Sequence, residues 1–239
     1  MNVLTNKNCF ITGATGGLGK QISYFLAKEN CNLFLTSTNK KNLEKIRKKI
    51  ISFNKNISVI CKSADLSKKN DLYKIINHAR NKFKKIDILI NCAGVFPLKK
   101  LSYSTLEEFD YCMNVNVKAP FYFIKEFSQD MIRNKWGCIV NIGSSSSYEG
   151  FKESSIYCAS KHAILGLSRS VHDELKNYNI RTFTISPGSI KTKMGRKVKN
   201  QDYQTFIQPE EIAKFLVHII SYNNEMFPNE VQLKRMYYD

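Results

Sequence analysis

The sequence lacks several features that would assign it to a special class. No apolar run approaches the roughly 18 residues that cross a bilayer, and the first seven residues have no apolar signal-peptide core. The seven cysteines include no C-x-x-C pair, which favours reduced thiols packed as small core residues over disulfides or a metal site. No linker, repeat or low-complexity segment divides the chain. We therefore expect one cytoplasmic domain over residues 1–239, with no membrane partner.

Acidic residues are scarce: 20 acidic against 37 basic residues give a formal net charge of +17. Such an excess is typical of proteins that bind nucleic acid or anionic membranes. Here the lysines are spread along the chain, without a basic module interleaved with aromatic residues, and the abundance of Asn, Ile and Lys indicates a compositional bias. Nucleic acid is thus not an expected partner, although the charge would help to collect phosphorylated or carboxylated ligands.

Short apolar runs alternate with stretches of helical periodicity, which predicts a parallel sheet with helices on both faces. The expected fold is an α/β, Rossmann-like, doubly wound sheet of about seven strands. The strand candidates are residues 8–12, 32–36, 57–61, 86–90, 137–142, 181–185 and 231–233.

A glycine-rich turn follows the first strand candidate, and helical spacing begins directly after it. Glycines at such a turn let the backbone approach a pyrophosphate, and the helix N-terminus offers free N–H groups to it. The candidate dinucleotide-binding residues of this turn are Gly13, Thr15, Gly17, Leu18 and Gly19.

No aspartate or glutamate occurs from Asn32 to Asn42, around the end of the second strand candidate. Dinucleotide-binding folds that use NAD commonly have an acidic residue at this point, whereas a basic neighbourhood accepts a 2′-phosphate. Ser37, Thr38 and Asn39 could bind that phosphate, with Lys40 or Lys41 adding charge. NADP(H) is therefore favoured over NAD(H), which stays open.

The strongest candidate for catalysis is the pair Tyr157 and Lys161, one helical turn apart. A lysine ammonium beside a phenol is expected to lower the phenol pKa from about 10 and to prepare it for proton transfer. Ser144 lies at the end of a strand candidate, where α/β proteins place reactive side chains. The pair alone is a weak signal, because two such residues are more often merely solvated or packed.

With these residues placed, the chain resembles the short-chain dehydrogenase/reductase family from Asn8 to about Leu233. Residues 12–19 resemble its T-G-x-x-x-G-x-G cofactor loop, and residues 91–94 resemble its N-N-A-G motif, with Cys92 as a departure expected to affect sheet packing more than chemistry. The resemblance implies these further cofactor contacts: Asp65, Leu66, Asn91, Ala93, Gly94, Tyr157, Lys161, Pro187, Gly188, Ile190 and Thr192.

The resemblance also implies a catalytic tetrad of Asn116, Ser144, Tyr157 and Lys161. In that reading Tyr157 protonates the substrate oxygen, Lys161 lowers the tyrosine pKa and binds the nicotinamide ribose, and Ser144 polarises the carbonyl. Asn116 would hold a water that links Lys161 to solvent. The implied reaction is hydride transfer between NADP(H) and a carbonyl or alcohol substrate, in the reducing direction.

The substrate itself is not specified by these motifs. The pocket is expected to draw on residues near Met194 and on Val95, Phe96, Pro97, Glu149, Gly150 and Phe151. The family further implies a homodimer or homotetramer packed through the helices that carry residues 121–127 and Tyr157. The alternatives are an NAD-dependent alcohol or sugar dehydrogenase, and a non-catalytic dinucleotide-binding scaffold or sensor.

Overall fold

The protein was analysed as a computed structural model, which describes residues 3–198, 201–222, 226 and 228–236. The expected domain, 1–239, therefore has ends at 1–2 and 237–239 that lie outside the described residues. The strands are β1 (Asn8–Ile11), β2 (Asn32–Ser37), β3 (Val59–Ser63), β4 (Ile88–Asn91), β5 (Gly137–Ile142), β6 (Ile180–Pro187) and β7 (Glu230–Leu233). The helices are α1 (Gly17–Lys28), α2 (Lys40–Phe53), α3 (Lys69–Phe83), α4 (Leu106–Met113), α5 (Ala119–Asn134), α6 (Ser155–Leu175) and α7 (Pro209–Ser221).

The strands form one parallel sheet in the order β3-β2-β1-β4-β5-β6-β7, which confirms the predicted fold. β1 lies inside the sheet, where Phe10 is paired with Phe34 of β2 and with Leu89 of β4. The chain order reverses at this strand, since β2 and β3 lie on one side and β4 to β7 on the other. The carboxyl ends of strands at such a switch point form the crevice in which open α/β sheets bind ligands.

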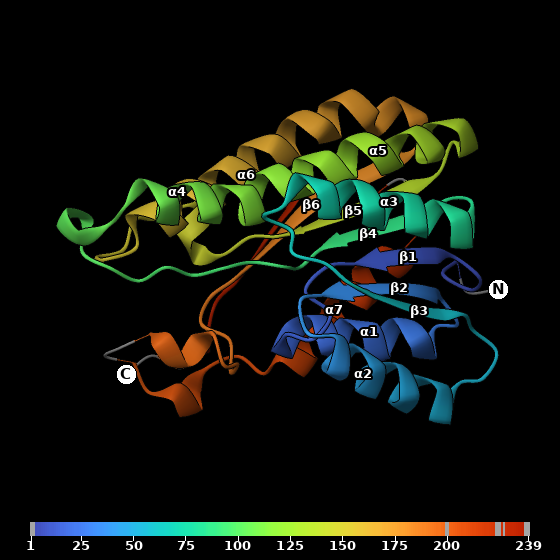
Figure 1. The fold of residues 1–239 in the computed structure, drawn as a ribbon, viewed down its shortest axis with the longest axis horizontal. Coiled ribbons are helices and arrows are strands. Elements are labelled where there is room, and N and C mark those ends of the chain that lie inside the picture. The colour runs from blue at the N-terminus through green and yellow to red at the C-terminus, as the bar shows by residue number, and fades with distance from the viewer. Residues whose placement is uncertain (1–2, 199–200, 223–225, 227, 237–239) are drawn as a thin grey trace.

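Helices cover both faces of the sheet (Figure 1). α1, α2 and α7 pack on one face through residues such as Ile22, Ile46 and Leu216. α3, α5 and α6 pack on the other, where Phe123 and Phe127 lie 5.0 and 4.9 Å from the ring of Phe10. Most of the aromatic surface in 121–127 is therefore core rather than subunit interface. Phe121 is the exception, with half of its surface exposed.

A π-helical turn, Asn114–Lys118, joins α4 to α5. Such turns insert an extra residue into a helix and occur frequently at functional sites. Here the turn buries Val115 and Asn116. The turn continues the helix beyond Met113, and the Asn116 amide lies toward the interior.

Trp136, the single tryptophan, lies at the amino-terminal ends of the strands, immediately before β5 begins. The ammonium of Lys7 lies 3.9 Å from its ring centroid, and the guanidinium of Arg181 lies 5.5 Å away. Cation–π contacts of this kind hold an indole in place. Trp136 is thus fixed at the amino-terminal edge of the strands.

The seven cysteines are free thiols, five of them buried and two partly buried. Burial keeps most of them in their neutral form, as for Cys9, whose pKa is well above its usual value because of desolvation. In the part of the chain that the structure describes, no helix has both the length and the apolarity to cross a bilayer.

Candidate active site

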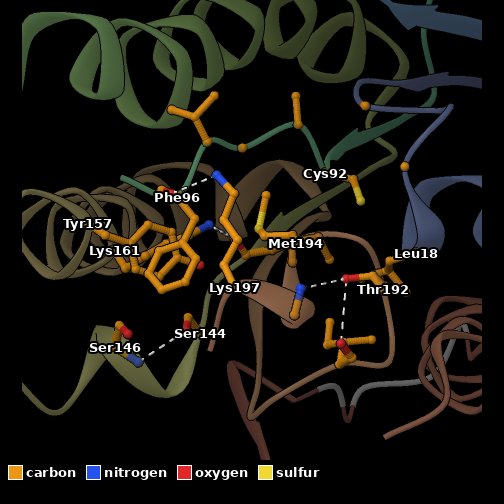
Figure 2. A pocket seen from close by; sticks show the side chains of 18 of the residues that line it. Leu18, Cys92, Phe96, Ser144, Ser146, Tyr157, Lys161, Thr192, Met194 and Lys197 are labelled. Atoms are coloured by element: carbon orange, nitrogen blue, oxygen red, sulfur yellow. Dashed lines mark hydrogen bonds between the residues drawn. The ribbon is translucent and has the colours of Figure 1, made fainter. Parts of the chain in front are cut away.

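A cavity of about 1010 Å³ opens at the carboxyl ends of the central strands (Figure 2). Its lining comes from the loops that follow β1, β2, β3, β4, β5 and β6, from α4 and the π-helical turn, and from the start of α6. Between β6 and α7, the described residues 188–198 and 201–208 cover one side, and they are called the lid here. The cavity is therefore where a doubly wound sheet is expected to bind its ligand.

The turn between β1 and α1 requires glycine at two points. Gly13 has φ of +65°, and a Cβ there would lie 2.7 Å from the Cα of Ala93. A Cβ on Gly17 would lie 2.5 Å from Cγ2 of Thr192 in the lid. The first turn of α1 has no acidic residue and no side-chain cap, and its residues line the cavity. Its free N–H groups and positive dipole end can therefore receive an anion.

Thr12 fixes the loop after β4 against this turn. Its hydroxyl oxygen accepts hydrogen bonds of 3.0 Å from the backbone N–H groups of both Cys92 and Ala93. Cys92, the departure from the N-N-A-G motif, lines the cavity. Burial raises the pKa of its thiol to about 12, against the opposing effect of Lys161.

Tyr157 lies near the start of α6 with its side chain in the cavity, and Ser144 lies just after β5. Burial raises the pKa of the Tyr157 phenol to about 12, while a hydrogen bond with Ser144 acts in the opposite direction. The Ser144 hydroxyl also accepts a 3.1 Å hydrogen bond from the N–H of Ser146, which fixes its rotamer. Ser144, rather than a neighbouring serine, thus contacts the tyrosine.

Lys161 is 5% exposed, and its ammonium lies 5.6 Å from the ring centroid of Tyr157. It donates a 2.7 Å hydrogen bond to the carbonyl of Ile142. Burial lowers the Lys161 pKa to about 8, although the thiols of Cys92 and Cys112 act to raise it. The expectation that Lys161 lowers the tyrosine pKa is not met in this arrangement, because burial of the phenol dominates.

Asn116 connects the π-helical turn to the loop after β4. Its Oδ1 accepts a 2.8 Å hydrogen bond from the N–H of Val95, and its Nδ2 donates to the Val95 carbonyl at 3.0 Å. Nδ2 also donates to the Ser160 hydroxyl at 3.0 Å. The amide is 3% exposed and does not line the cavity. Its contacts hold the cavity wall and α6 together.

Two residues cover Tyr157. The ring of Phe96 packs against it, with 4.6 Å between ring centroids. The ammonium of Lys197, from the lid, donates a 3.3 Å hydrogen bond to the Phe96 carbonyl. Figure 2 shows Lys197 reaching across the cavity to Phe96 beside Tyr157. The lid and the loop after β4 therefore meet directly above the tyrosine.

The profile of the short chain dehydrogenase family matches residues 7–203, which is most of the chain. The chain belongs to this family. An uncharacterized oxidoreductase of Staphylococcus saprophyticus is 30% identical over 240 residues, with 96% of each chain covered. An oxidoreductase of Staphylococcus aureus is 28% identical, covering 98% of this chain and 99% of its own. The protein is accordingly an oxidoreductase of the short-chain dehydrogenase family.

Solved structures of the family agree with the fold. A metagenomic short-chain oxidoreductase in complex with NADP has a TM-score of 0.86 at 25% identity, covering 98% of this chain and 99% of its own. Levodione reductase has a TM-score of 0.84 at 25% identity, covering 96% of each chain. An alcohol dehydrogenase from the archaeon Thermococcus sibiricus, 24% identical with a TM-score of 0.88 and 98% coverage of each chain, shares the fold.

Most of the candidate residues come together at this cavity. Those that line it are Gly13, Thr15, Gly17, Leu18, Gly19, Ser37, Thr38, Asp65, Leu66, Ala93, Gly94, Ser144, Tyr157, Lys161, Pro187, Gly188, Ile190 and Thr192. Asn39 lies outside the lining and caps α2 instead, accepting a 2.9 Å hydrogen bond from the N–H of Asn42. Asn91 lies beneath the cavity and donates to Asn141 at 2.8 Å.

The expected substrate pocket is corrected in part. Val95, Phe96, Phe151 and Met194 line the cavity, whereas Pro97, Glu149 and Gly150 do not. Residues that line it without having been singled out include Tyr111, Val115, Lys152, Glu153, Lys193 and Lys197. The spacing of Tyr111 and Val115, four residues apart, was a signal for a shared helix face. Nothing local in the sequence indicates that the lid lysines face inward.

Proposed function

We propose that this oxidoreductase reduces a carbonyl compound to an alcohol with NADP(H), using Asn116, Ser144, Tyr157 and Lys161. The observation that carries the proposal is the convergence of Ser144 and Lys161 on Tyr157 inside the cavity. The Ser144 hydroxyl acts to lower the pKa of the phenol, and the Lys161 ammonium lies 5.6 Å from the ring centroid. Groups that donate hydrogen bonds and protons at one point can stabilise a carbonyl oxygen as it gains charge.

The cavity fits a dinucleotide. The free N–H groups at the start of α1 suit its pyrophosphate, and glycines at 13 and 17 leave room that a Cβ would fill. Asp65 and Leu66 line the same cavity beyond β3 and suit the adenine, while Thr192 of the lid lies against Gly17. The cofactor supplies hydride chemistry, and the chain supplies position and electrostatics.

In the proposed mechanism Ser144 donates a hydrogen bond to the substrate carbonyl oxygen, which polarises the bond. Tyr157 donates its phenolic proton to that oxygen. Lys161 holds positive charge near the phenol as it loses this proton. Asn116 acts at a distance from the reacting atoms, since its side chain forms hydrogen bonds with Val95, Ser160 and Cys112. We therefore assign Asn116 the role of positioning the cavity wall and α6. The proposal also includes the role that the family resemblance implies for it, which is to hold a water.

The Tyr157 phenol is suited to act as the acid of a reduction. Burial raises its pKa to about 12, so it is neutral at physiological pH and has a proton to donate. Reduction of a carbonyl consumes such a proton, which is compatible with the proposed direction.

The preference for NADP(H) rests on the end of β2. Ser37 and Thr38 line the cavity, and the Ser37 hydroxyl lies 2.5 Å from that of Thr15. Residues 32–42 contain no carboxylate, while Lys40 and Lys41 are exposed at the first turn of α2. A 2′-phosphate meets hydroxyl donors and positive charge here rather than repulsion. The similar metagenomic oxidoreductase is in complex with NADP.

Calorimetric titration with NADPH and NADH, followed by turnover of a panel of aldehydes and ketones, tests the proposal. We expect the dissociation constant for NADPH to be at least tenfold lower, about 1.4 kcal/mol. Thr38→Asp should reverse the preference by repelling the 2′-phosphate, while Lys74→Gln, an exposed charge change on α3, should leave it unchanged. Tighter binding of NADH would replace the cofactor assignment, and turnover of no carbonyl would remove the proposed reaction.

We also infer a homodimer or homotetramer, from exposed apolar side chains around the start of α4. Leu101, Tyr103 and Leu106 are 75%, 66% and 79% exposed, and Phe121 on α5 is half-exposed. Clustered apolar exposure is typical of an interaction surface. Light scattering at micromolar concentration tests this inference, and a monomer mass would refute it. A cytoplasmic location stays a prediction of the sequence.

A further inference from the structure

The substrate side of the cavity has an apolar wall with cations at its rim. The wall consists of Phe96, Leu98, Tyr111, Val115, Phe151 and Met194. Three lysines line the same cavity: Lys152 before α6, and Lys193 and Lys197 from the lid. Apolar pockets with a few placed polar groups use those groups to orient a ligand. The lysines are therefore the part of this surface that can select for charge.

These three lysines have no carboxylate partner within the described residues, where the ion pairs of lysine involve other positions. Lys197 is held over the cavity by its bond to a neutral partner, the Phe96 carbonyl at 3.3 Å. A charge that is positioned but not neutralised is available to a ligand. Oxygen anions are the ligands that such ammonium groups bind.

Two other cations among the described residues of the lid are engaged elsewhere. Lys191 donates a 2.6 Å hydrogen bond to Gln204, and its ammonium also lies over the ring of Tyr203. Arg196 lies over the same ring, at 5.0 Å from its centroid. Neither residue lines the cavity. The lid thus separates cations that bind its own outer part from Lys193 and Lys197, which face the ligand space.

Acidic groups do not balance these lysines. Among the residues that the structure describes, two carboxylates line the cavity, Asp65 and Glu153. Asp65 follows β3, an edge strand, whereas Tyr157 lies in α6, after β5. Asp65 accepts a 2.7 Å hydrogen bond from the Ser67 hydroxyl. Glu153 is thus the single acidic residue among the described lining near Lys152 and the lid. Three lysines against one glutamate leave this region positive.

We propose that the substrate is an anionic carbonyl compound, in which a carboxylate or phosphate bound by Lys152, Lys193 and Lys197 is joined by an apolar body to the carbonyl that reaches Tyr157. The inference rests on the proposed reductase function and adds the substrate class. The apolar wall contacts the body of the substrate. The lysines orient it, so that the carbonyl end points toward Ser144 and Tyr157.

The test compares three aldehydes that differ in charge on one apolar ring: 4-carboxybenzaldehyde, 4-formylphenyl phosphate and the neutral methyl 4-formylbenzoate. With NADPH and the full-length protein, we expect kcat/KM for an anionic aldehyde to exceed that of the ester by about tenfold, the sum of three partly exposed charge contacts. The better of the two anions identifies the charged group. Added NaCl should raise KM for the anions and not for the ester.

Variants separate charge recognition from lid structure. The triple variant Lys152→Gln, Lys193→Gln, Lys197→Gln should raise KM for the preferred anion by about tenfold and change that of the ester less than twofold. Arg196→Gln is the matched control, because it removes a lid charge outside the cavity. It should change neither the KM for the anion nor the KM for the ester. An ester reduced as well as both anions, or an equal loss for all three aldehydes in the triple variant, would overturn the proposal.

A binding measurement keeps the substrate class separate from the reaction. If no aldehyde is reduced, the reductase proposal fails, and calorimetry with 4-(hydroxymethyl)benzoate and its methyl ester, with and without NADP⁺, decides the anion site. Tighter binding of the carboxylate by wild type than by the triple variant supports the site. Equal binding of the acid and ester, or of neither, overturns it.

Discussion

The ammonium of Lys161 donates a 2.7 Å hydrogen bond to the carbonyl of Ile142, which ties α6 to the last residue of β5. The lysine is therefore part of the wall that supports Tyr157 and not only a neighbour of its phenol. Burial at this position lowers the lysine pKa to about 8. This places its loss of charge within the range of an ordinary pH profile.

The first prediction concerns that profile. Below pH 8 Lys161 is an ammonium that supports the developing phenolate, and above it the charge is lost, so kcat/KM for reduction should fall as pH rises through about 8. Lys161→Arg keeps its charge at every accessible pH. The kcat/KM of this variant should be lower than that of the wild type, but it should not decline as pH rises through 8. A decline at the same pH in the arginine variant would assign the titration to another group.

The second prediction concerns stability. The folded pKa of Lys161, about 8, lies below its ordinary value of 10.5, so the unfolded chain binds the proton more tightly. The charged form thus lowers stability below pH 8, and this cost disappears as pH rises past 10.5. Lys161→Met should raise the free energy of unfolding by about 1–3 kcal/mol at pH 7. Urea unfolding at several pH values measures it, and a lower stability of the variant at pH 7 would contradict it.

The third prediction concerns the proton donor. Tyr157→Phe removes the phenolic hydroxyl and keeps the ring contact with Phe96 at 4.6 Å between centroids. We expect kcat to fall by about a thousandfold while NADPH binding and Tm are retained. Ser144→Ala, which removes a hydrogen-bond donor to the same oxygen, should cost about a hundredfold. Normal turnover by Tyr157→Phe would remove this residue from the mechanism.

The fourth prediction concerns the glycine turn. Gly13→Ala combines φ of +65° with a Cβ only 2.7 Å from the Cα of Ala93, so the backbone must move. We expect a loss of about 1–3 kcal/mol in stability and a large loss of NADPH affinity. Gly166→Ala on α6 is the control, since its Cβ would meet no atom within 4 Å. That change should stabilise the protein by about 0.5–1 kcal/mol, and similar losses in both variants would refute the argument.

The sequence was sufficient to predict the parallel sheet, because seven short apolar runs and the intervening helical periodicity are local signals. The arrangement at β1, with β2 on one side and β4 on the other, is a family property that periodicity alone does not specify. Spacing also placed Tyr157 and Lys161 on one helix face, as observed in α6.

What the sequence could not predict depends on burial and on contacts distant in the chain. The pKa of Tyr157 rises instead of falling, because the phenol lies beneath Phe96 and loses its hydration. Lys197 reaches the carbonyl of Phe96, 101 positions away, and no local pattern indicates which lid lysines turn inward. Asn116 bonds the backbone of Val95, a partner set by the π-helical turn.

The position of Trp136 has a practical consequence. Its indole lies between Lys7 and Arg181 at the amino-terminal edge of the sheet, while the candidate active site is at the carboxyl edge. Its fluorescence should therefore report loss of the sheet and be nearly insensitive to occupancy of the distant cavity, whereas the fluorescence of a reduced nicotinamide reports that cavity. One sample can thus give separate optical readings of integrity and of ligand binding.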